Sequence, residues 1–141
     1  MIRVTRRYRF SASHRLHADA LTESENRKLY GKCNNPYGHG HNYEIEVSVR
    51  GPVDERSGRV VDLRTLDQLV ERQVLRPFDH QNMNADIAAF HGVVPTTENL
   101  AGEIYRRLEA GWKSTFRAEW PRLEKIRIAE TQRNIFEISG P

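Results

Sequence analysis

Apolar and polar residues alternate along the first stretch of the chain. From Ile2 to His14 the even-numbered positions carry mainly apolar side chains, and the odd-numbered positions carry arginine, threonine or serine. A period of two puts these two sets on opposite faces, which is the pattern of a half-buried β-strand. The sequence therefore predicts a strand over residues 2–14, and His14 belongs to the row that faces the core.

A second alternation starts near His41 and stops at Gly51-Pro52, so another strand is predicted there. After a turn, Asp62 stands where a helix N-cap would be. It is followed by an apolar stripe with helical spacing, made of Leu63, Leu66, Leu69, Val70 and Val74. We expect this helix to end at Pro77.

The segment Pro95-Thr96-Thr97-Glu98 has the composition of a helix start, with a threonine as cap and a carboxylate in the first turn. Its buried stripe comprises Leu100, Ile104, Leu108 and Trp112. Two more strands are predicted around 126–130 and 136–138. We expect residues 15–38 to form a long loop, and residues 78–95 to be mostly loop with a short helix near 86–90.

The predicted order is strand, strand, helix, helix, strand, strand. This order favours an α+β domain, with a four-stranded, largely antiparallel sheet and two helices packed on one face. The length of 141 residues suits a single domain over residues 1–141.

Four polar residues continue the apolar rows of the predicted strands, namely His14, His39, His41 and Glu130. If the first two strands pair antiparallel, and the third is antiparallel to the second, all four lie at one end of the sheet and on its helix-covered side. Three neutral imidazoles are the ligand set of an open catalytic zinc site. A non-haem iron site with two histidines and the Glu130 carboxylate is the alternative. We favour zinc, because His14 already completes a three-histidine set.

Further chemistry is suggested by the only cysteine and by one acidic pair. Cys33 follows Lys32 and lies close to the expected dication in sequence, and both features favour the thiolate. If His80 reached Cys33, Asp79 could fix the tautomer of His80 and the three residues would form a proton relay. A carboxylate on an apolar row is costly unless it accepts hydrogen bonds, so Glu130 suits a ligand with two parallel N–H groups.

Composition narrows the function classes. The net charge is +3 and the basic residues are scattered, which argues against a nucleic-acid partner. No apolar run approaches the ~20 residues of a membrane helix. A lone cysteine fits a reducing compartment, and the strand pattern begins at once without a secretory signal, so we expect a cytoplasmic protein.

Several motifs, in order, resemble the 6-pyruvoyl-tetrahydropterin synthase family. They are Phe10-Ser11-Ala12-Ser13-His14-Arg15-Leu16, Gly31-Lys32-Cys33-Asn34-Asn35-Pro36, Gly38-His39-Gly40-His41-Asn42-Tyr43, Asp79-His80, Thr96-Thr97-Glu98-Asn99 and Glu130-Thr131. The resemblance runs from about residue 8 to the C-terminus. It implies the tunnelling fold (T-fold) and a homohexamer of two stacked trimers, with pockets at subunit interfaces.

The resemblance also implies a reaction and a set of residues. The substrate would be 7,8-dihydroneopterin triphosphate, which loses triphosphate while its side chain undergoes an internal redox rearrangement. His14, His39 and His41 would bind Zn2+, and Cys33, Asp79 and His80 would be the catalytic triad. Glu130 would anchor the pterin, with Thr96 and Thr97 beside it. The residues that meet the triphosphate stay open among Arg15, Lys28, Lys32 and Arg133.

Two other functions are compatible with these motifs. The first is that of 6-carboxy-tetrahydropterin synthase in the queuosine pathway, which shares the substrate, the zinc ligands and the Cys/Asp/His set. The spacing from Cys33 to His39 resembles the pyruvoyl type, which we favour. The second is a catalytically silent zinc or pterin-binding module, which would not need Cys33, Asp79 and His80 together.

Overall fold

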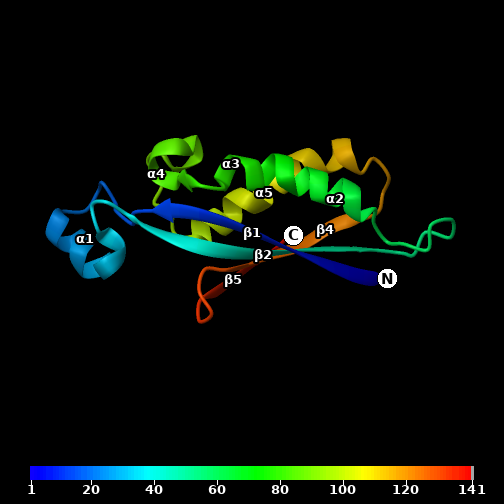
Figure 1. Cartoon of the computed structure of the whole chain (residues 1–141), viewed down its shortest axis with the longest axis horizontal. Coiled ribbons are helices and arrows are strands. Elements are labelled where there is room, and N and C mark those ends of the chain that lie inside the picture. The colour runs from blue at the N-terminus through cyan, green and yellow to red at the C-terminus, as the bar shows by residue number, and fades with distance from the viewer. Residues whose placement is uncertain (141) are drawn as a thin grey trace.

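The computed structural model describes residues 1–140 and is organised around one long antiparallel hairpin. Strand β1 (Ile2–His14) pairs with β2 (His39–Gly51) in a register that runs from Ile2 opposite Gly51 to His14 opposite His39. Strands β4 (Arg122–Ala129) and β5 (Ile135–Ser139) continue the antiparallel arrangement beside β2. These four strands confirm the antiparallel sheet that the alternating pattern predicts (Figure 1).

The sheet has a fifth strand that the sequence did not predict. Strand β3 (Gln81–Asn82) runs parallel to β1 at Ala12 and Ser13, which gives a mixed sheet with the order β3-β1-β2-β4-β5. The prediction of a purely four-stranded sheet was therefore wrong. Two residues are too few to show a period of two, so this strand leaves no pattern in the sequence.

Helices α2 (Leu63–Val70), α3 (Arg76–Phe78) and α5 (Thr97–Thr115) lie on one side of the sheet (Figure 1). Asp62 caps α2 by accepting the backbone N–H groups of Arg64 and Thr65. A π-helical turn, Glu71–Leu75, joins α2 to α3. The helical run therefore passes Pro77 and ends at Phe78, unlike the predicted end. Pro77 stands directly after the π-helical turn, where the regular hydrogen bonding of the α-helix is already interrupted.

The core fills the space between these helices and the sheet. Fully buried side chains include Leu66, Leu69, Leu100, Ile104 and Leu108 from the helices, and Ile45, Val47, Ile126 and Ile128 from the strands. Helix α5 begins as predicted, because the Thr96 hydroxyl accepts the backbone N–H of Asn99. These are the apolar stripes that the sequence indicates, so the helix-covered side of the sheet is confirmed.

Residues 15–38 form a small lobe at the end of the β1–β2 hairpin, and the prediction of a plain loop was wrong. Helix α1 (Glu23–Tyr30) starts with a capping box between Thr22 and Glu25, and a 3-10 turn, Gly31–Asn34, follows it. The only buried residue of α1 is Asn26, whose amide donates to carbonyls of residues 18–22. Because a polar side chain holds this helix, it carries no apolar stripe.

The segment between α3 and α5 is also more helical than expected. Helix α4 (Met83–Asp86), capped by Asn82, precedes a 3-10 turn at Ala88–Phe90. Of the helices within residues 1–140, none is both long and apolar enough to cross a membrane.

Candidate functional site: a histidine cluster at the end of the sheet

Three histidines meet where β1 ends and β2 begins. His14 is the last residue of β1 and pairs with His39, the first residue of β2, and His41 follows on the same face. One nitrogen of each ring lies within 4.8 Å of the corresponding nitrogens of the other two. Strand pairing and side-chain alternation thus bring together the three residues that the sequence predicts as metal ligands.

Hydrogen bonding fixes the orientation of His14. Its Nδ1 lies 2.8 Å from the carbonyl oxygen of Pro95. A carbonyl only accepts, so Nδ1 carries the proton and the Nε2 lone pair faces the cluster, 3.1 Å from His39 Nε2. Burial, with a smaller effect from the neighbouring histidines, lowers the pKa of His14 to about 4. His14 is therefore a neutral imidazole, which is the form that binds metals.

The other two histidines also suit a metal ion. Burial lowers the pKa of His41, although the charge of Glu130 opposes this effect. Within residues 1–140, the buried atoms His39 Nδ1 and His41 Nε2 have no hydrogen-bond partner. A buried nitrogen without a partner is costly unless something else binds it. Three imidazoles with converging nitrogens, among them the buried His41 Nε2, are a donor set that fits a divalent transition metal.

Glu130 reaches the same cluster from the turn after β4. Its backbone N–H donates to the Asn134 carbonyl, and its carboxylate is 13% exposed. One carboxylate oxygen lies 3.1 Å from His41 Nε2 and 3.8 Å from His14 Nε2. The structure thus places the fourth predicted residue beside the histidines. A carboxylate here can accept a hydrogen bond from a ligand or from metal-bound water.

Two buried hydroxyl groups lie near the cluster. The ring centroids of Tyr43 and His41 are 5.6 Å apart, and the Tyr43 hydroxyl is buried without a hydrogen-bond partner within residues 1–140. The Thr97 hydroxyl is also buried and lies beside the Tyr43 hydroxyl, whereas Thr96 uses its hydroxyl to cap α5. Burial, with the nearby charge of Glu130, raises the pKa of Tyr43. In the sequence, Tyr43 is singled out only as the end of the Gly38–Tyr43 motif, although it is the next member of the row formed by His39 and His41.

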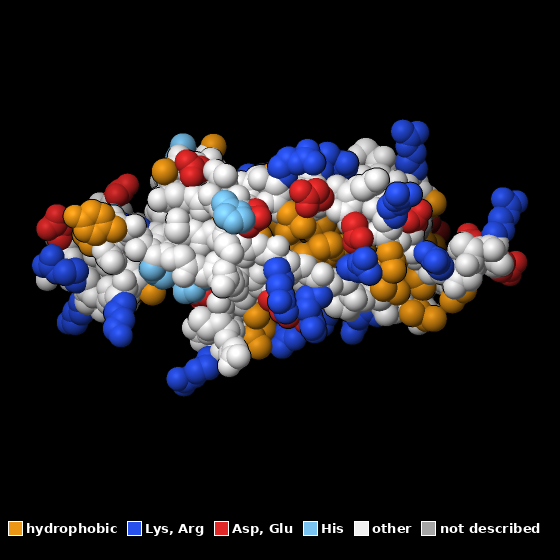
Figure 2. Space-filling model, in the orientation of Figure 1, with side chains coloured by type: hydrophobic (Ala, Val, Ile, Leu, Met, Phe, Trp, Pro, Cys, Tyr) orange, Lys and Arg blue, Asp and Glu red, His pale blue; other side chains and the backbone are white. Residues whose placement is uncertain are grey.

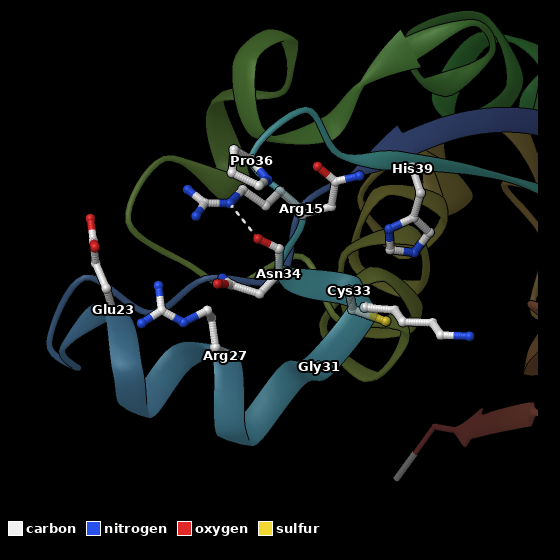
Figure 3. A pocket seen from close by; sticks show the side chains of 10 residues that line it. Arg15, Glu23, Arg27, Gly31, Cys33, Asn34, Pro36 and His39 are labelled. Carbon is white, nitrogen blue, oxygen red and sulfur yellow. Dashed lines mark hydrogen bonds between the residues drawn. The ribbon is translucent and has the colours of Figure 1, made fainter.

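Cys33 belongs to the lobe formed by residues 15–38. Its carbonyl accepts the N–H of Leu16 at 2.8 Å, which ties the 3-10 turn to the chain just after β1. Cys33 and His39 line a common pocket of about 710 Å³ (Figure 3). Burial and the charge of Glu130 raise the pKa of the Cys33 thiol. These two effects do not favour the thiolate, so the expected thiolate depends on the positive charge of a bound metal ion and stays a prediction.

Asp79 and His80 form a separate pair at the edge of the sheet. Asp79 accepts the Ser11 backbone N–H at 2.9 Å, and its other oxygen lies 3.0 Å from His80 Nδ1. His80 adopts a φ of 60°, and its imidazole is 82% exposed. Within residues 1–140 no hydrogen bond joins His80 to Cys33, and the pocket lined by His80 is a different one. One chain therefore does not assemble the predicted proton relay.

Comparison with known proteins gives one consistent result. The family model for 6-pyruvoyl tetrahydropterin synthase matches residues 3–141. A 6-pyruvoyl tetrahydrobiopterin synthase from Poecilia reticulata is 44% identical over 97% of this chain and 89% of its own length. The solved structure of Caenorhabditis elegans 6-pyruvoyl tetrahydropterin synthase has a TM-score of 0.91 at 39% identity, over 99% of this chain and 96% of that one.

A second class of relative is more distant. A putative 6-carboxy-5,6,7,8-tetrahydropterin synthase from Archaeoglobus fulgidus is 33% identical over 71% of this chain and 74% of its own length. The similarity to the pyruvoyl class is thus higher and covers more of the chain.

Proposed function

Because this chain belongs to the 6-pyruvoyl tetrahydropterin synthase family, we propose that it converts 7,8-dihydroneopterin triphosphate to 6-pyruvoyl-tetrahydropterin and releases triphosphate. The protein is a lyase of the 6-pyruvoyl-tetrahydropterin synthase type that acts on a small pterin. The observation that carries the proposal is the convergence of three histidine nitrogens within 4.8 Å, with the Glu130 carboxylate beside them.

In this proposal His14, His39 and His41 hold Zn2+. When bound, zinc would act as a Lewis acid toward the side-chain oxygens of the substrate and would stabilise the enolate-like negative charge that forms when a carbon-bound proton leaves. Its positive charge would also favour the Cys33 thiolate. Support comes from the neutral His14 ring, whose Nε2 lies 3.1 Å from His39 Nε2, and from the buried His41 Nε2 beside them. The half-buried Cys33 then accepts a proton from carbon.

Glu130 is the proposed anchor of the pterin ring. Its carboxylate could accept the ring N3–H and the 2-amino group together, which would fix the ring beside the histidines. Thr96 and Thr97 are the proposed neighbours of the ring. The Thr97 hydroxyl is the one available for such a contact, because Thr96 already caps α5.

Asp79 and His80 are proposed to act in the site of another copy of the chain. The pair is already oriented by the Ser11 backbone, but it is exposed and lines a different pocket from Cys33. A homohexamer of two stacked trimers, with sites at its subunit interfaces, would bring His80 of one copy to Cys33 of another. His80, held by Asp79, would then relay protons.

The reaction of the carboxy relatives is the second candidate, and the Archaeoglobus fulgidus protein is its support. The pyruvoyl reaction is preferred because the relatives of that class match nearly the whole chain at higher identity. We further propose that residues 1–141 act as one domain, and that the enzyme works in the cytoplasm, which its lone cysteine fits.

A product assay tests the proposed function. Zinc-loaded protein is incubated with 7,8-dihydroneopterin triphosphate without reductant, and the pterin product is identified by mass spectrometry, with Cys33→Ala alongside. We expect a pyruvoyl-tetrahydropterin that the variant does not form. A carboxy product with acetaldehyde would instead favour the second candidate, and bound zinc and pterin without turnover would indicate a silent module.

A further inference from the structure

Tyr43 carries a buried hydroxyl group that no step of the proposed reaction uses. Its side chain is fully buried, and within residues 1–140 the hydroxyl has no hydrogen-bond partner. Figure 2 shows histidine side chains at the surface on the half of the molecule that ends in α1, whereas Tyr43, the next residue in the row of His39 and His41, is wholly covered. A phenylalanine would fill the same space without burying a polar atom, so this hydroxyl requires an explanation.

Neighbouring aromatic rings fix the position of the Tyr43 hydroxyl. The ring stacks on Phe10, its partner in the β1–β2 register, with centroids 5.1 Å apart and ring planes at 21°. The rings of His14 and His41 contact it edge to face, with centroids 6.5 Å and 5.6 Å away. A ring packed on these sides cannot swing its hydroxyl out to solvent. The hydroxyl must therefore find a partner inside the site or stay unpaired.

The strand register places Glu130 opposite Tyr43. The ladder between β2 and β4 ends with Glu44 opposite Ala129. The next residues beyond this end are Tyr43 and Glu130, and residues that face each other across antiparallel strands project on the same side of the sheet. One Glu130 oxygen lies 3.1 Å from His41 Nε2, in the row that Tyr43 continues, and the charge of Glu130 contributes to the raised pKa of Tyr43. A carboxylate acceptor thus lies beside the unpaired hydroxyl.

The neighbouring Thr97 hydroxyl does not remove the need for this acceptor. It is buried and lies beside the Tyr43 hydroxyl. Each hydroxyl has one hydrogen to donate, so a bond between the two would still leave one O–H of the pair without an acceptor. The pair therefore has a spare donor next to the Glu130 carboxylate.

We propose that Tyr43 is a positioning residue for Glu130, and that its hydroxyl donates a hydrogen bond to the Glu130 carboxylate when that carboxylate binds the pterin. Each carboxylate oxygen has two lone pairs, so it can accept from Tyr43 and from the ligand together. Hydrogen bonds to a carboxylate are stronger than those between neutral groups, and a second donor would fix the carboxylate in one orientation. That the ligand is a pterin rests on the proposed function, whereas the contact between Tyr43 and Glu130 does not.

The test uses zinc-loaded full-length protein and neopterin, a pterin that carries no phosphate and so cannot lose triphosphate. Neopterin affinity is measured by fluorescence titration for wild type, Tyr43→Phe, Glu130→Gln and the double variant. Tyr8→Phe is the matched control, because Tyr8 also faces the helices but its hydroxyl already donates to Asp67 on α2 at 2.7 Å. Thermal unfolding without neopterin and turnover of 7,8-dihydroneopterin triphosphate are measured in parallel, at equal protein concentrations.

We expect Tyr43→Phe to weaken neopterin binding about tenfold, because a hydrogen bond to the carboxylate is lost. In the Glu130→Gln background the same change should weaken binding less than about threefold, because the partner is already altered. The unfolding midpoint of Tyr43→Phe should stay equal or rise by up to about 4 °C, since an unpaired buried group is removed, whereas that of Tyr8→Phe should fall by about 2 °C. Tyr43→Phe should also raise KM more than it lowers kcat, and Tyr8→Phe should change neither.

The affinities decide the proposal. Equal neopterin affinity in wild type and Tyr43→Phe, an equal loss in Tyr8→Phe, or losses that simply multiply in the double variant would overturn the positioning role. Wild-type turnover alongside any of these results would leave the proposed function standing. Coupled neopterin binding without turnover would keep the role of Tyr43 and refute the proposed function.

Discussion

Two groups of polar side chains lie near the end of the sheet, and they differ in how they are held: the three histidines converge within one chain, whereas Cys33 and the Asp79–His80 pair lie apart. The histidines stand at the paired ends of β1 and β2, where register and alternation fix their distances. The other set is spread over a 3-10 turn and the edge of the sheet, and its parts line different pockets. The pairing of β1 with β2 fixes the distances between the histidines within one chain. No strand pairing fixes the distance between Cys33 and His80, so their approach can depend on a second chain.

The largest effect should come from breaking the cluster. We expect His39→Ala to lose its bound metal and to form product more than about a hundredfold more slowly. Loss of a residue that only hydrogen-bonds to a metal ligand already lowers metal affinity or activity by about 10- to 100-fold, and His39 is a proposed ligand itself. Metal content by mass spectrometry and product formation are the measurements. His91→Ala is the control, since His91 is exposed and lies outside the cluster. Full metal content in His39→Ala would show that the cluster is not the metal site.

Loss of the proposed proton relay should leave metal binding unchanged. Cys33→Ala should lower kcat by about 10²- to 10⁴-fold, the usual share of general acid and base catalysis, while metal content stays at the wild-type level. The reason is that Cys33 lies outside the histidine set and shares only its pocket. Retained turnover in this variant would remove Cys33 from the reaction.

Glu130 lies beside the histidine cluster, but its proposed role is to bind the pterin ring and not the metal. Glu130→Gln keeps the shape and removes the charge, so we expect pterin binding to weaken about tenfold or more. The pKa of the Cys33 thiol should fall in this variant, because the Glu130 charge raises it in the wild type. Fluorescence titration with a pterin and thiol labelling against pH measure the two effects. An unchanged pterin affinity would exclude the anchor role.

The smallest effect should come from a contact that belongs neither to the histidine cluster nor to the Cys33, Asp79 and His80 set, and it should be an effect on stability. Asp67 on α2 accepts hydrogen bonds from Arg6 and Tyr8 on β1, and the Arg6 guanidinium holds the pKa of Asp67 below its usual range. A lowered folded-state pKa gives stability above about pH 4 that is lost as the pH falls through that pKa. Because Asp67 is 38% exposed and therefore screened, Asp67→Asn should cost only about 0.5 to 1 kcal/mol at pH 7.

Urea unfolding at pH 7 and in acid measures this difference between Asp67→Asn and wild type. The gap should narrow in acid, because protonated Asp67 resembles Asn. Metal content and kcat should not change. A gap that widens as the pH falls would contradict the assigned direction of the pKa shift.

The sequence predicted the elements that obey a period and missed those that do not. The strands, the Asp62 cap and the Thr96 cap follow from alternation and from local hydrogen-bond chemistry. Helix α1 was missed because its one buried contact is the polar Asn26, and β3 was missed because it has two residues.

The same distinction applies to the site. His14, His39, His41 and Glu130 could be placed together because each extends a strand row. The position of Cys33 relative to His80 depends on how two irregular segments pack, which no period encodes. The unpartnered Tyr43 hydroxyl could have been noticed as the next residue of the histidine row.

The most direct test of the account is subunit complementation. Cys33→Ala and His80→Ala chains are co-expressed in equal amounts, and activity is compared with that of each variant alone and with that of the double variant mixed with wild type. If His80 serves the Cys33 of another copy, random assortment should restore about a quarter of the sites. Activity in the mixed oligomer near that level is the predicted result. A mixture as inactive as its parents, with metal and assembly intact, would show that the relay does not cross between chains.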